Sequence, residues 1–286
     1  MLSRVYSGAV YGVNAFSVEI EVNAGRGDSQ FVIVGLPDAA VRESKDRVWT
    51  AMNNSGFRPT LGRTTINLAP ADVKKEGPVY DLPIAAGLLA ATGSAEMPHL
   101  DRFALIGELA LSGEVRRVRG VLPVTLEMRR RGMQGILVPA DNAEEAAVAD
   151  GIDVYPVRHL RDAIDFLSGK LELQPFKIEL ADLIRRERDH REDFADVKGQ
   201  ETAKRAIEVA VSGGHNILMV GSPGAGKTML ARRVPSILPE MHLEEALEAT
   251  RIHSIAGPLK SHQALIFHRP SRAPHHTISD AGLLGG

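Results

Sequence analysis

The chain of 286 residues contains no cysteine, and this absence excludes several kinds of site. Without cysteine there are no disulfides, no thiolate zinc sites and no cysteine nucleophile. An excess of one charge is also missing, because 34 Lys and Arg residues against 36 Asp and Glu residues give a formal net charge of −2. Such a balance gives no general attraction to nucleic acid or to anionic membranes, so any binding of that kind must come from local patches.

Long apolar runs are missing as well, and none approaches the ~18 residues of a membrane-spanning helix. Residues 1–22 are partly apolar, but Ser7, Gly8 and Gly12 interrupt them. A signal peptide needs an uninterrupted apolar core of roughly 7–15 residues, so the stretch predicts two strands joined by a turn instead. These absences favour a cytoplasmic protein.

Residues 1–169 alternate between strand-like and helix-like patterns, which predicts a mixed α/β domain. Apolar runs predict strands at 30–37, 64–70, 135–139 and 152–157, with two short strands within 104–118. Helices are predicted at 38–57, 81–93, 121–132, 142–151 and 158–169, the first of them capped by Asp38. The charged stretch 170–192 predicts a solvated linker, and residues 193–286 form a second domain.

The second domain contains a phosphate-binding pattern. The residues Gly221, Ser222, Pro223, Gly224, Ala225, Gly226, Lys227 and Thr228 match G-x-x-x-x-G-K-[ST] in full. An apolar strand is predicted at 215–221 and a helix begins directly after the loop. Glycines let the backbone turn tightly so that its N–H groups point at phosphates, and the helix start favours anions. We expect Lys227 to reach the β- and γ-phosphates of a nucleotide and the Thr228 hydroxyl to ligate Mg²⁺.

Two further stretches identify the family that the chain resembles. The segment DVKGQ, with Val197, Gly199 and Gln200, precedes a helix, a strand and the loop, an order that resembles the opening of an AAA+ ATPase. In that family the matching segment lies against adenine, which implies ATP as the nucleotide and Mg²⁺ as its metal. The stretches RIHSIAG and FHRPSRAPHHTISDAGLLGG resemble the ComM/YifB family of magnesium-chelatase-like AAA+ proteins. This resemblance implies self-association into a ring, expected to be a hexamer in the complete protein.

The first domain resembles the proteolytic domain of Lon proteases, a fold that the ComM/YifB family shares. In Lon a DGP turn precedes the nucleophilic serine, whereas here Val79 follows the Glu76–Pro78 turn. The stretch 107–124 resembles the second Lon segment, and the position of its lysine falls on or near Leu122. Because neither the hydroxyl nor the amine is present, we expect no peptidase activity. The fold class expected for the chain is α/β, an α+β domain of Lon type followed by a partial P-loop AAA+ α/β domain.

A cluster of basic residues supplies a candidate contact with DNA. Six arginines lie within sixteen residues, opposed there only by Glu127: Arg116, Arg117, Arg119, Arg129, Arg130 and Arg131. Guanidinium groups suit phosphate oxygens, so the cluster is a candidate site for backbone contacts with DNA. The alternative is ordinary surface charge on a strand edge and at a helix end, where cations also complement the helix dipole.

Three functions remain open on the sequence. The resemblance implies a DNA-translocating AAA+ ATPase of helicase or branch-migration type, linked to natural transformation and recombination. The second is a magnesium-chelatase-type ATPase that remodels a protein partner, and the third is a non-catalytic module for nucleotide binding and docking.

AAA+ hydrolysis also needs an acidic Walker-B strand, in which apolar residues are followed by Asp-Glu. No stretch between residues 229 and 286 has that pattern. We therefore expect a chain that is truncated relative to its family, that binds nucleotide weakly and that does not hydrolyse it.

Overall fold

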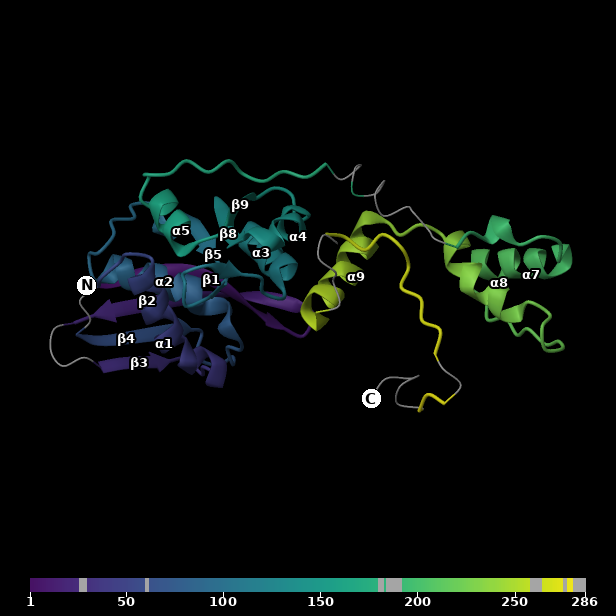
Figure 1. Cartoon of the computed structure of the whole chain (residues 1–286), viewed down its shortest axis with the longest axis horizontal. Coiled ribbons are helices and arrows are strands. Elements are labelled where there is room, and N and C mark those ends of the chain that lie inside the picture. The colour runs from purple at the N-terminus through teal and green to yellow at the C-terminus, as the bar shows by residue number, and fades with distance from the viewer. Residues whose placement is uncertain are drawn as a thin grey trace. The chain divides into compact units, whose positions relative to one another are not determined.

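The computed structural model of the chain describes residues 1–25, 30–59, 62–179, 183, 192–257, 264–274 and 277–279. These residues fall into two compact units, which Figure 1 shows from purple at the N-terminus to yellow at the C-terminus. The first unit comprises Met1–Glu179 with Thr250–Leu265, and the second comprises Leu180–Ala249 with Ile266–Gly286. The sequence assigned all residues from 193 onward to one domain, so the grouping of Thr250–Leu265 with the first unit differs from that expectation.

A mixed sheet forms the centre of the first unit. Within the described residues its seven strands lie in the order β3-β4-β2-β1-β5-β8-β9. Their bounds are β1 Leu2–Tyr11, β2 Asn14–Ala24, β3 Gln30–Val34, β4 Arg63–Ala69, β5 Phe103–Leu105, β8 Gly135–Pro139 and β9 Asp153–Val157. The β1–β2 and β2–β4 pairs are antiparallel, and the other neighbours are parallel. The mixed α/β fold predicted from the alternating patterns is therefore confirmed.

The helices of the first unit lie close to the predicted positions. They are α1 Ala39–Asn54, α2 Asp81–Ala91, α3 Val121–Arg130, α4 Ala143–Ala147 and α5 Leu160–Leu167. Short 3₁₀ turns occupy Pro78–Tyr80, Leu100–Arg102 and Ala140–Asn142. The predicted cap of α1 is confirmed, because the Val41 N–H donates to the Asp38 carboxylate at 2.8 Å. Where the sequence predicted two short strands within 104–118, the structure has three: β5, which joins the large sheet, and a separate antiparallel ribbon of β6 Glu108–Leu109 with β7 Val115–Arg116.

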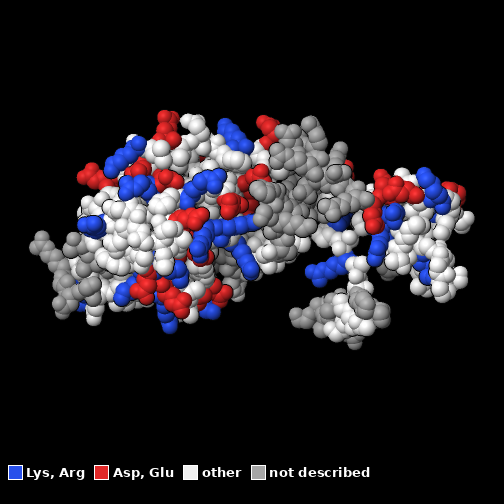
Figure 2. Space-filling model, viewed as in Figure 1, with Lys and Arg blue, Asp and Glu red and all other residues white. Residues whose placement is uncertain are grey.

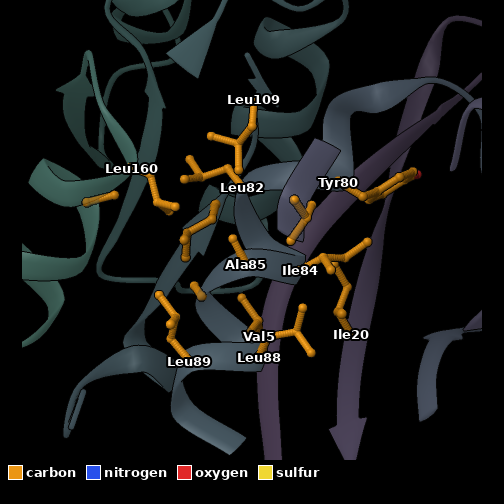
Figure 3. Close-up of a cluster of buried hydrophobic side chains, with 14 of the residues drawn as sticks. Val5, Ile20, Tyr80, Leu82, Ile84, Ala85, Leu88, Leu89, Leu109 and Leu160 are labelled. Atoms are coloured by element: carbon orange, nitrogen blue, oxygen red, sulfur yellow. The ribbon is translucent and has the colours of Figure 1, made fainter. Parts of the chain in front are cut away.

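Helix α2 is central to the hydrophobic core of this unit. It is apolar on every side, and such a helix is stable only when it is surrounded by other elements. Figure 3 shows its residues Leu82, Ile84, Ala85, Leu88 and Leu89 among side chains from β1, β2, β6 and α5. The start of α2 therefore has a fixed position relative to the sheet.

The start of the predicted linker lies along the edge of the sheet. The Phe176 N–H donates to the Val154 carbonyl oxygen of β9 at 2.7 Å. Residues 170–179 therefore belong to the first unit, and from residue 180 only 183 and 192 of the linker fall within the described part of the chain.

The second unit contains helices α7 Glu201–Ser212, α8 Lys227–Arg233 and the beginning of α9 Leu243–Ala256, with 3₁₀ turns at Phe194–Asp196 and Val234–Ile237. Phe194, Val197, Ile207 and Leu230 form its small core. The predicted strand at 215–221 is wrong for this structure, since the segment is irregular and Leu218 and Val220 are 86% and 87% exposed. A strand needs a neighbour to satisfy its backbone groups, and the described residues of this unit contain none. No helix in the described ranges has the length and apolar content needed to cross a membrane.

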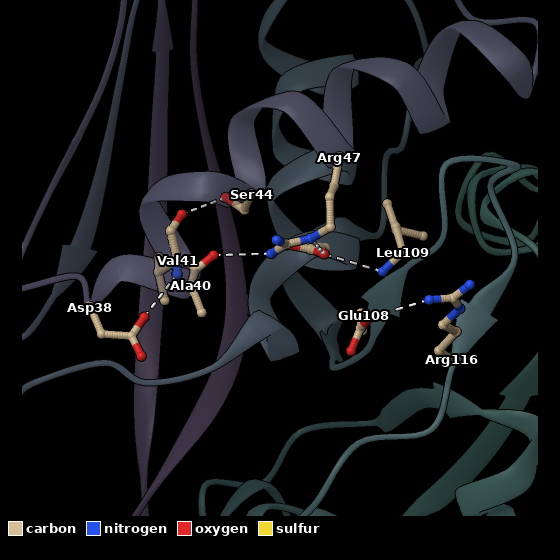
Figure 4. Close-up of polar contacts among 9 residues, drawn as sticks. Asp38, Ala40, Val41, Ser44, Arg47, Glu108, Leu109 and Arg116 are labelled. Carbon is tan, nitrogen blue, oxygen red and sulfur yellow. Dashed lines mark hydrogen bonds and ion pairs between the residues drawn. The ribbon is translucent and has the colours of Figure 1, made fainter.

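A buried ion pair ties α1, α2 and β6 together. The Asp81 side chain is fully buried, and the partly exposed Arg47 guanidinium contacts both of its carboxylate oxygens, at 2.8 and 3.1 Å. Arg47 also donates to the Ala40 carbonyl oxygen at 3.0 Å, and the Leu109 N–H donates to Asp81 at 3.3 Å (Figure 4). Burial raises the pKa of Asp81 to about 6, although the hydrogen bond and the charge of Arg47 act in the opposite direction.

Replacement of Asp81 by Ala tests this pair, because it leaves the Arg47 guanidinium without its carboxylate. We expect the free energy of unfolding of the first unit to fall by about 3 kcal/mol. Trp49 in α1 is the only tryptophan of the chain, so its fluorescence during urea denaturation follows this unit. The control is Glu76→Ala, whose exposed pair with Lys74 contributes at most about 1 kcal/mol. Equal losses in the two variants would contradict the central role of Asp81.

Candidate functional site

The phosphate-binding pattern forms an exposed loop in front of α8. Residues 221–225 are exposed, and Gly224 and Gly226 have φ angles of +80° and +83°. Glycine adopts this left-handed conformation without the strain that a Cβ atom causes. At Gly226 an added Cβ would also lie 2.9 Å from the Gln200 amide nitrogen. Gly224 and Gly226 are therefore required by the backbone path of the loop.

The Lys227 ammonium group lies at the loop itself. It donates to the carbonyl oxygens of Gly221 and Ser222 at 2.8 and 2.9 Å. Thr228 follows with an exposed side chain. The Lys227 ammonium group thus lies against two carbonyl groups of the loop. Phosphate oxygens of a bound nucleotide could replace these carbonyl groups as its acceptors.

The segment that resembles an adenine-contacting stretch lies beside this loop. Gly199 and Gln200 have positive φ angles, and the Gln200 side-chain amide donates to the Ala225 carbonyl oxygen at 3.0 Å. Val197 is 2% exposed and belongs to the core of the second unit. The structure therefore brings Gln200 to the loop, while the Val197 side chain anchors the segment.

These residues fit a nucleotide with Mg²⁺. The loop backbone is accessible, its lysine is in place, and Thr228 offers a hydroxyl beside it. In the described ranges no cluster of three or more His, Asp or Glu side chains could hold a metal. A Mg²⁺ ion at Thr228 would therefore depend on phosphate oxygens and water for its other ligands, as is common for this ion.

The six arginines predicted to contact DNA do not act as one free cluster. Arg130 and Arg131 both pair with Glu127, at 2.7 and 3.3 Å. Arg129 donates to the carbonyl oxygens of Ala149 and Asp150 at 2.5 and 3.1 Å.

At the other end of α3, Arg116 lies 3.7 Å from Glu108, while Arg117 and Arg119 line a cavity. Figure 2 shows basic and acidic side chains interspersed over the visible face. Four of the six arginines therefore already have acceptors in the chain.

The cavity has a volume of about 650 Å³ and lies in the first unit. Residues from four segments line it, within 8–12, 76–80, 106–108 and 117–124, together with Asp38 and Ile255. Val79, the residue at the Lon serine position, is one of them. Leu122 is fully buried and does not line the cavity, where α3 contributes Val124 instead.

Among the described residues no amine replaces the missing Lon lysine, since neither lysine nor histidine is among those that line this cavity. Lys75, which lies close to Val79 in the sequence, is fully buried. Its ammonium group donates to the carbonyl oxygens of Pro70 and Val73. Burial also lowers the pKa of Lys75, but its position makes it a structural clamp of the turn rather than a base in the cavity.

The last residues of α9 lie beside the cavity. The Ser254 hydroxyl donates to the Glu145 carboxylate at 2.5 Å, and the Gly120 N–H donates to the Ser254 carbonyl oxygen at 3.2 Å. Arg251 donates to the Val13 carbonyl oxygen at 3.0 Å. These contacts explain why Thr250–Leu265 groups with the first unit, which sequence patterns did not indicate. Of the family-specific stretch 268–286, residues 275–276 and 280–286 lie outside the described residues.

Comparisons with known proteins find matches to both parts of the chain. A family model described as subunit ChlI of Mg-chelatase matches residues 20–142, and a second, described as magnesium chelatase, subunit ChlI, matches residues 193–286. The competence protein ComM of Haemophilus influenzae is 40% identical and YifB of Escherichia coli is 42% identical, each across 100% of this chain.

An uncharacterized protein of Mycobacterium tuberculosis is 45% identical, also across 100% of the chain. The chain spans 55–56% of the length of these three relatives. Lon protease 2 of Bacillus subtilis is 25% identical over 192 residues, which cover 60% of this chain and 34% of the protease. Despite this similarity to Lon, the described residues that line the cavity include no nucleophile at position 79, which is Val79, and no amine.

Restoring the hydroxyl alone tests this interpretation. We expect the variant Val79→Ser to leave fluorescent casein uncut, because none of the described residues that line the cavity is a lysine or histidine able to accept the serine proton. The measurement is the release of soluble fluorescence over time, with the unmodified chain as the matched control and trypsin as the positive one. Release that depends on Ser at position 79 would contradict it.

Proposed function

Because this chain belongs to the ComM/YifB family of magnesium-chelatase-like proteins, we propose that it binds ATP as part of an AAA+ motor that acts on DNA. The observation that carries the proposal is the exposed loop with Lys227 held against its carbonyl groups. The name of the competence protein ComM supports a role in the handling of transforming DNA, by helicase or branch-migration activity. We place this activity in the cytoplasm.

In this proposal each loop residue has a separate part. The backbone from Gly221 to Gly226 surrounds the phosphates, and Lys227 exchanges its two carbonyl acceptors for phosphate oxygens. Thr228 contributes its hydroxyl to Mg²⁺, which neutralises phosphate charge when it is bound. Gln200 keeps the adenine-side segment attached to the loop through Ala225.

Hydrolysis needs groups beyond these. An acidic residue must hold Mg²⁺, and a neighbouring subunit supplies an arginine in ring-forming AAA+ proteins. Residues 229–286 contain no apolar run followed by Asp-Glu. We therefore propose that turnover depends on regions found in the longer relatives and on assembly into a ring, with a hexamer as the expected size.

A chelatase-type function is the second candidate, because the matching family models are described as magnesium chelatase subunits. In that case the ATP cycle would remodel a protein partner and be indifferent to DNA. The similarity to Lon protease 2, which covers 60% of this chain, is not expected of a strict chelatase, although residues 20–142 match the first of these models. A third candidate is a non-catalytic module that binds nucleotide and docks other proteins.

Replacement of Lys227 by Ala tests nucleotide binding. We expect the affinity for a fluorescent ATP analogue with Mg²⁺ to fall about tenfold or more, because a charge-assisted contact to phosphate is lost. The matched control is Arg205→Ala, which removes one exposed positive charge from α7 in the same unit. Equal affinities of the Lys227 variant and the unmodified chain would overturn the assignment of the loop.

The same proteins test turnover. Phosphate release by the 286-residue chain should remain at background. Release above background that is lost in the Lys227 variant would show that the chain is catalytically complete.

DNA binding is tested with the exposed arginines at the end of α3. Their pairs with Glu127 are partly exposed, so phosphate oxygens can compete for them. We expect Arg130→Gln with Arg131→Gln to weaken binding of a DNA duplex and to reduce the slope of log affinity against log salt by about 2. The control Arg4→Gln with Arg63→Gln removes the same charge from β1 and β4. Binding that is independent of salt, or equal in both double variants, would favour the chelatase-type function.

A further inference from the structure

The cavity of the first unit contains an unpaired strand edge. All ten residues of β1 pair with β2, but on its other side β1 pairs with β5 through Tyr6 and Ala104 alone. Gly8, Ala9 and Val10, which lie beyond that pair, line the cavity. Within the described residues the second half of β1 therefore has no neighbouring strand on this side. An open edge of this kind accepts an extended peptide through main-chain hydrogen bonds.

The glycine at position 8 belongs to this arrangement. A Cβ atom there would lie 2.6 Å from a methyl carbon of Val124 in α3. Helix α3 therefore approaches β1 closely, and its N-terminal part forms one wall of the cavity while β1 forms another.

The acidic side chains of the cavity already have partners. Asp38 accepts two backbone N–H groups, at 2.8 and 3.0 Å. Glu76 pairs with Lys74 at 2.8 Å, and Glu108 lies 3.7 Å from Arg116. Glu76 and Glu108 therefore each have a basic partner, whereas Asp38 keeps its negative charge and has only backbone N–H donors.

Two guanidinium groups in the same cavity outnumber the one carboxylate that has no basic partner, Asp38. Arg117 is half-buried and Arg119 is exposed, and neither has a hydrogen bond or ion pair with any described residue. Excess positive charge in a partly enclosed space selects an anionic group, and a guanidinium fork matches a carboxylate or a phosphate.

The remaining lining decides between these two anions. Val10, Val79 and Ile255 are half-buried and present aliphatic surface. Tyr80, the only aromatic residue in the described part of the lining, is 1% exposed and offers no face on which a base could stack. Nucleic acid recognised in such a cavity would lack the stacking that single strands need. Aliphatic side chains next to a carboxylate fit better.

We propose that this cavity binds an extended peptide segment of another protein. The segment adds to the free edge of β1, places aliphatic side chains against Val10 and Val79, and directs a carboxylate to Arg117 and Arg119. The carboxylate is either the C-terminus of the peptide or an acidic side chain, since both present the same group. This site is independent of the ATP-binding loop and requires no nucleotide.

Fluorescence anisotropy with the 286-residue chain tests the proposal directly. The probe is a fluorescein-labelled peptide of sequence Gly-Thr-Val-Thr-Val-Glu-Val with a free C-terminus. Its C-terminal amide and its Glu-to-Gln form distinguish the two sources of the carboxylate. We expect one of them to bind about tenfold more weakly. Undetectable binding of the free-acid peptide, or equal binding of all three forms, would overturn the proposal.

Main-chain pairing is tested with peptides that carry N-methyl groups. In a strand that adds to one edge, alternate N–H groups point toward the partner strand. Methylation of one alternate set should therefore abolish binding, whereas methylation of the other set should preserve it. Equal sensitivity of the two sets would overturn strand addition. These chemical variants leave the protein unchanged, so its folding does not affect the result.

Protein variants locate the site. Arg117→Gln and Arg119→Gln should each weaken peptide binding about tenfold, while Arg63→Gln, an equal change of charge on β4 outside the cavity, should leave it unchanged. Trp49 fluorescence during urea denaturation verifies that all three variants fold. Equal losses in all three would show a general charge effect. Displacement of the peptide by duplex DNA, with DNA binding lost in the Arg117 and Arg119 variants, would assign the cavity to nucleic acid and overturn the peptide.

The outcome is distinguishable from that of the ATP proposal. The Lys227→Ala variant should bind the peptide as tightly as the unmodified chain does, because Lys227 belongs to the second unit. If the unmodified chain binds the peptide but not ATP, the result supports the peptide site and contradicts only the ATP proposal. Loss of peptide binding in that variant would contradict the independence of the two sites.

Discussion

The buried Asp81 carboxylate is the interaction on which the architecture of the first unit depends. It is the first residue of α2, accepts hydrogen bonds from Nε and Nη2 of Arg47 in α1, and accepts one from the N–H of Leu109 in β6. A buried carboxylate without such partners is unstable, so three elements are drawn to one point. Val79 and Tyr80 directly precede Asp81, and they form part of the cavity wall. The shape of the cavity therefore follows from an ion pair that lies outside it.

The two units differ in how their apolar segments are satisfied. In the first, the apolar side chains of α2 are enclosed by the core, and the Phe176 N–H of the segment 170–179 donates to Val154 of β9. In the second, the apolar segment 215–221 has no described strand beside it, and Leu218 and Val220 remain exposed. The glycines and Lys227 nevertheless form the loop, because their geometry is set by local backbone conformation and by hydrogen bonds within six residues. Local interactions thus specify the loop, whereas a strand at 215–221 would need a neighbouring strand from a distant part of the chain.

The same distinction explains what the sequence could predict. The helices of the first unit, the Asp38 cap and the lack of a nucleophile at Val79 were predictable, since periodicity, capping and motif turns act over a few residues. The presence of six arginines could be read from the sequence, but whether they are free to bind DNA could not. In the structure Glu127 pairs with Arg130, and the carbonyl oxygen of Ala149 accepts from Arg129. The position of the Lon lysine at Leu122 did not correspond to a residue of the cavity. The docking of Thr250–Leu265 and the order of the strands rest on contacts between distant residues, for which the sequence carries no local signal.

The cavity also shows how a protease-like arrangement can act through affinity alone. Cleavage of a bound peptide needs a hydroxyl and a base to activate it, whereas strand pairing needs only a free backbone edge. Val79 supplies no hydroxyl, so cleavage is not possible there, whereas β1 beyond Tyr6 still offers a free backbone edge. The guanidinium groups of Arg117 and Arg119 add a preference for carboxylate that involves no bond cleavage. A peptide held in this way leaves chemically unchanged, so the occupancy of the cavity depends on concentration and affinity, as it does in a docking site.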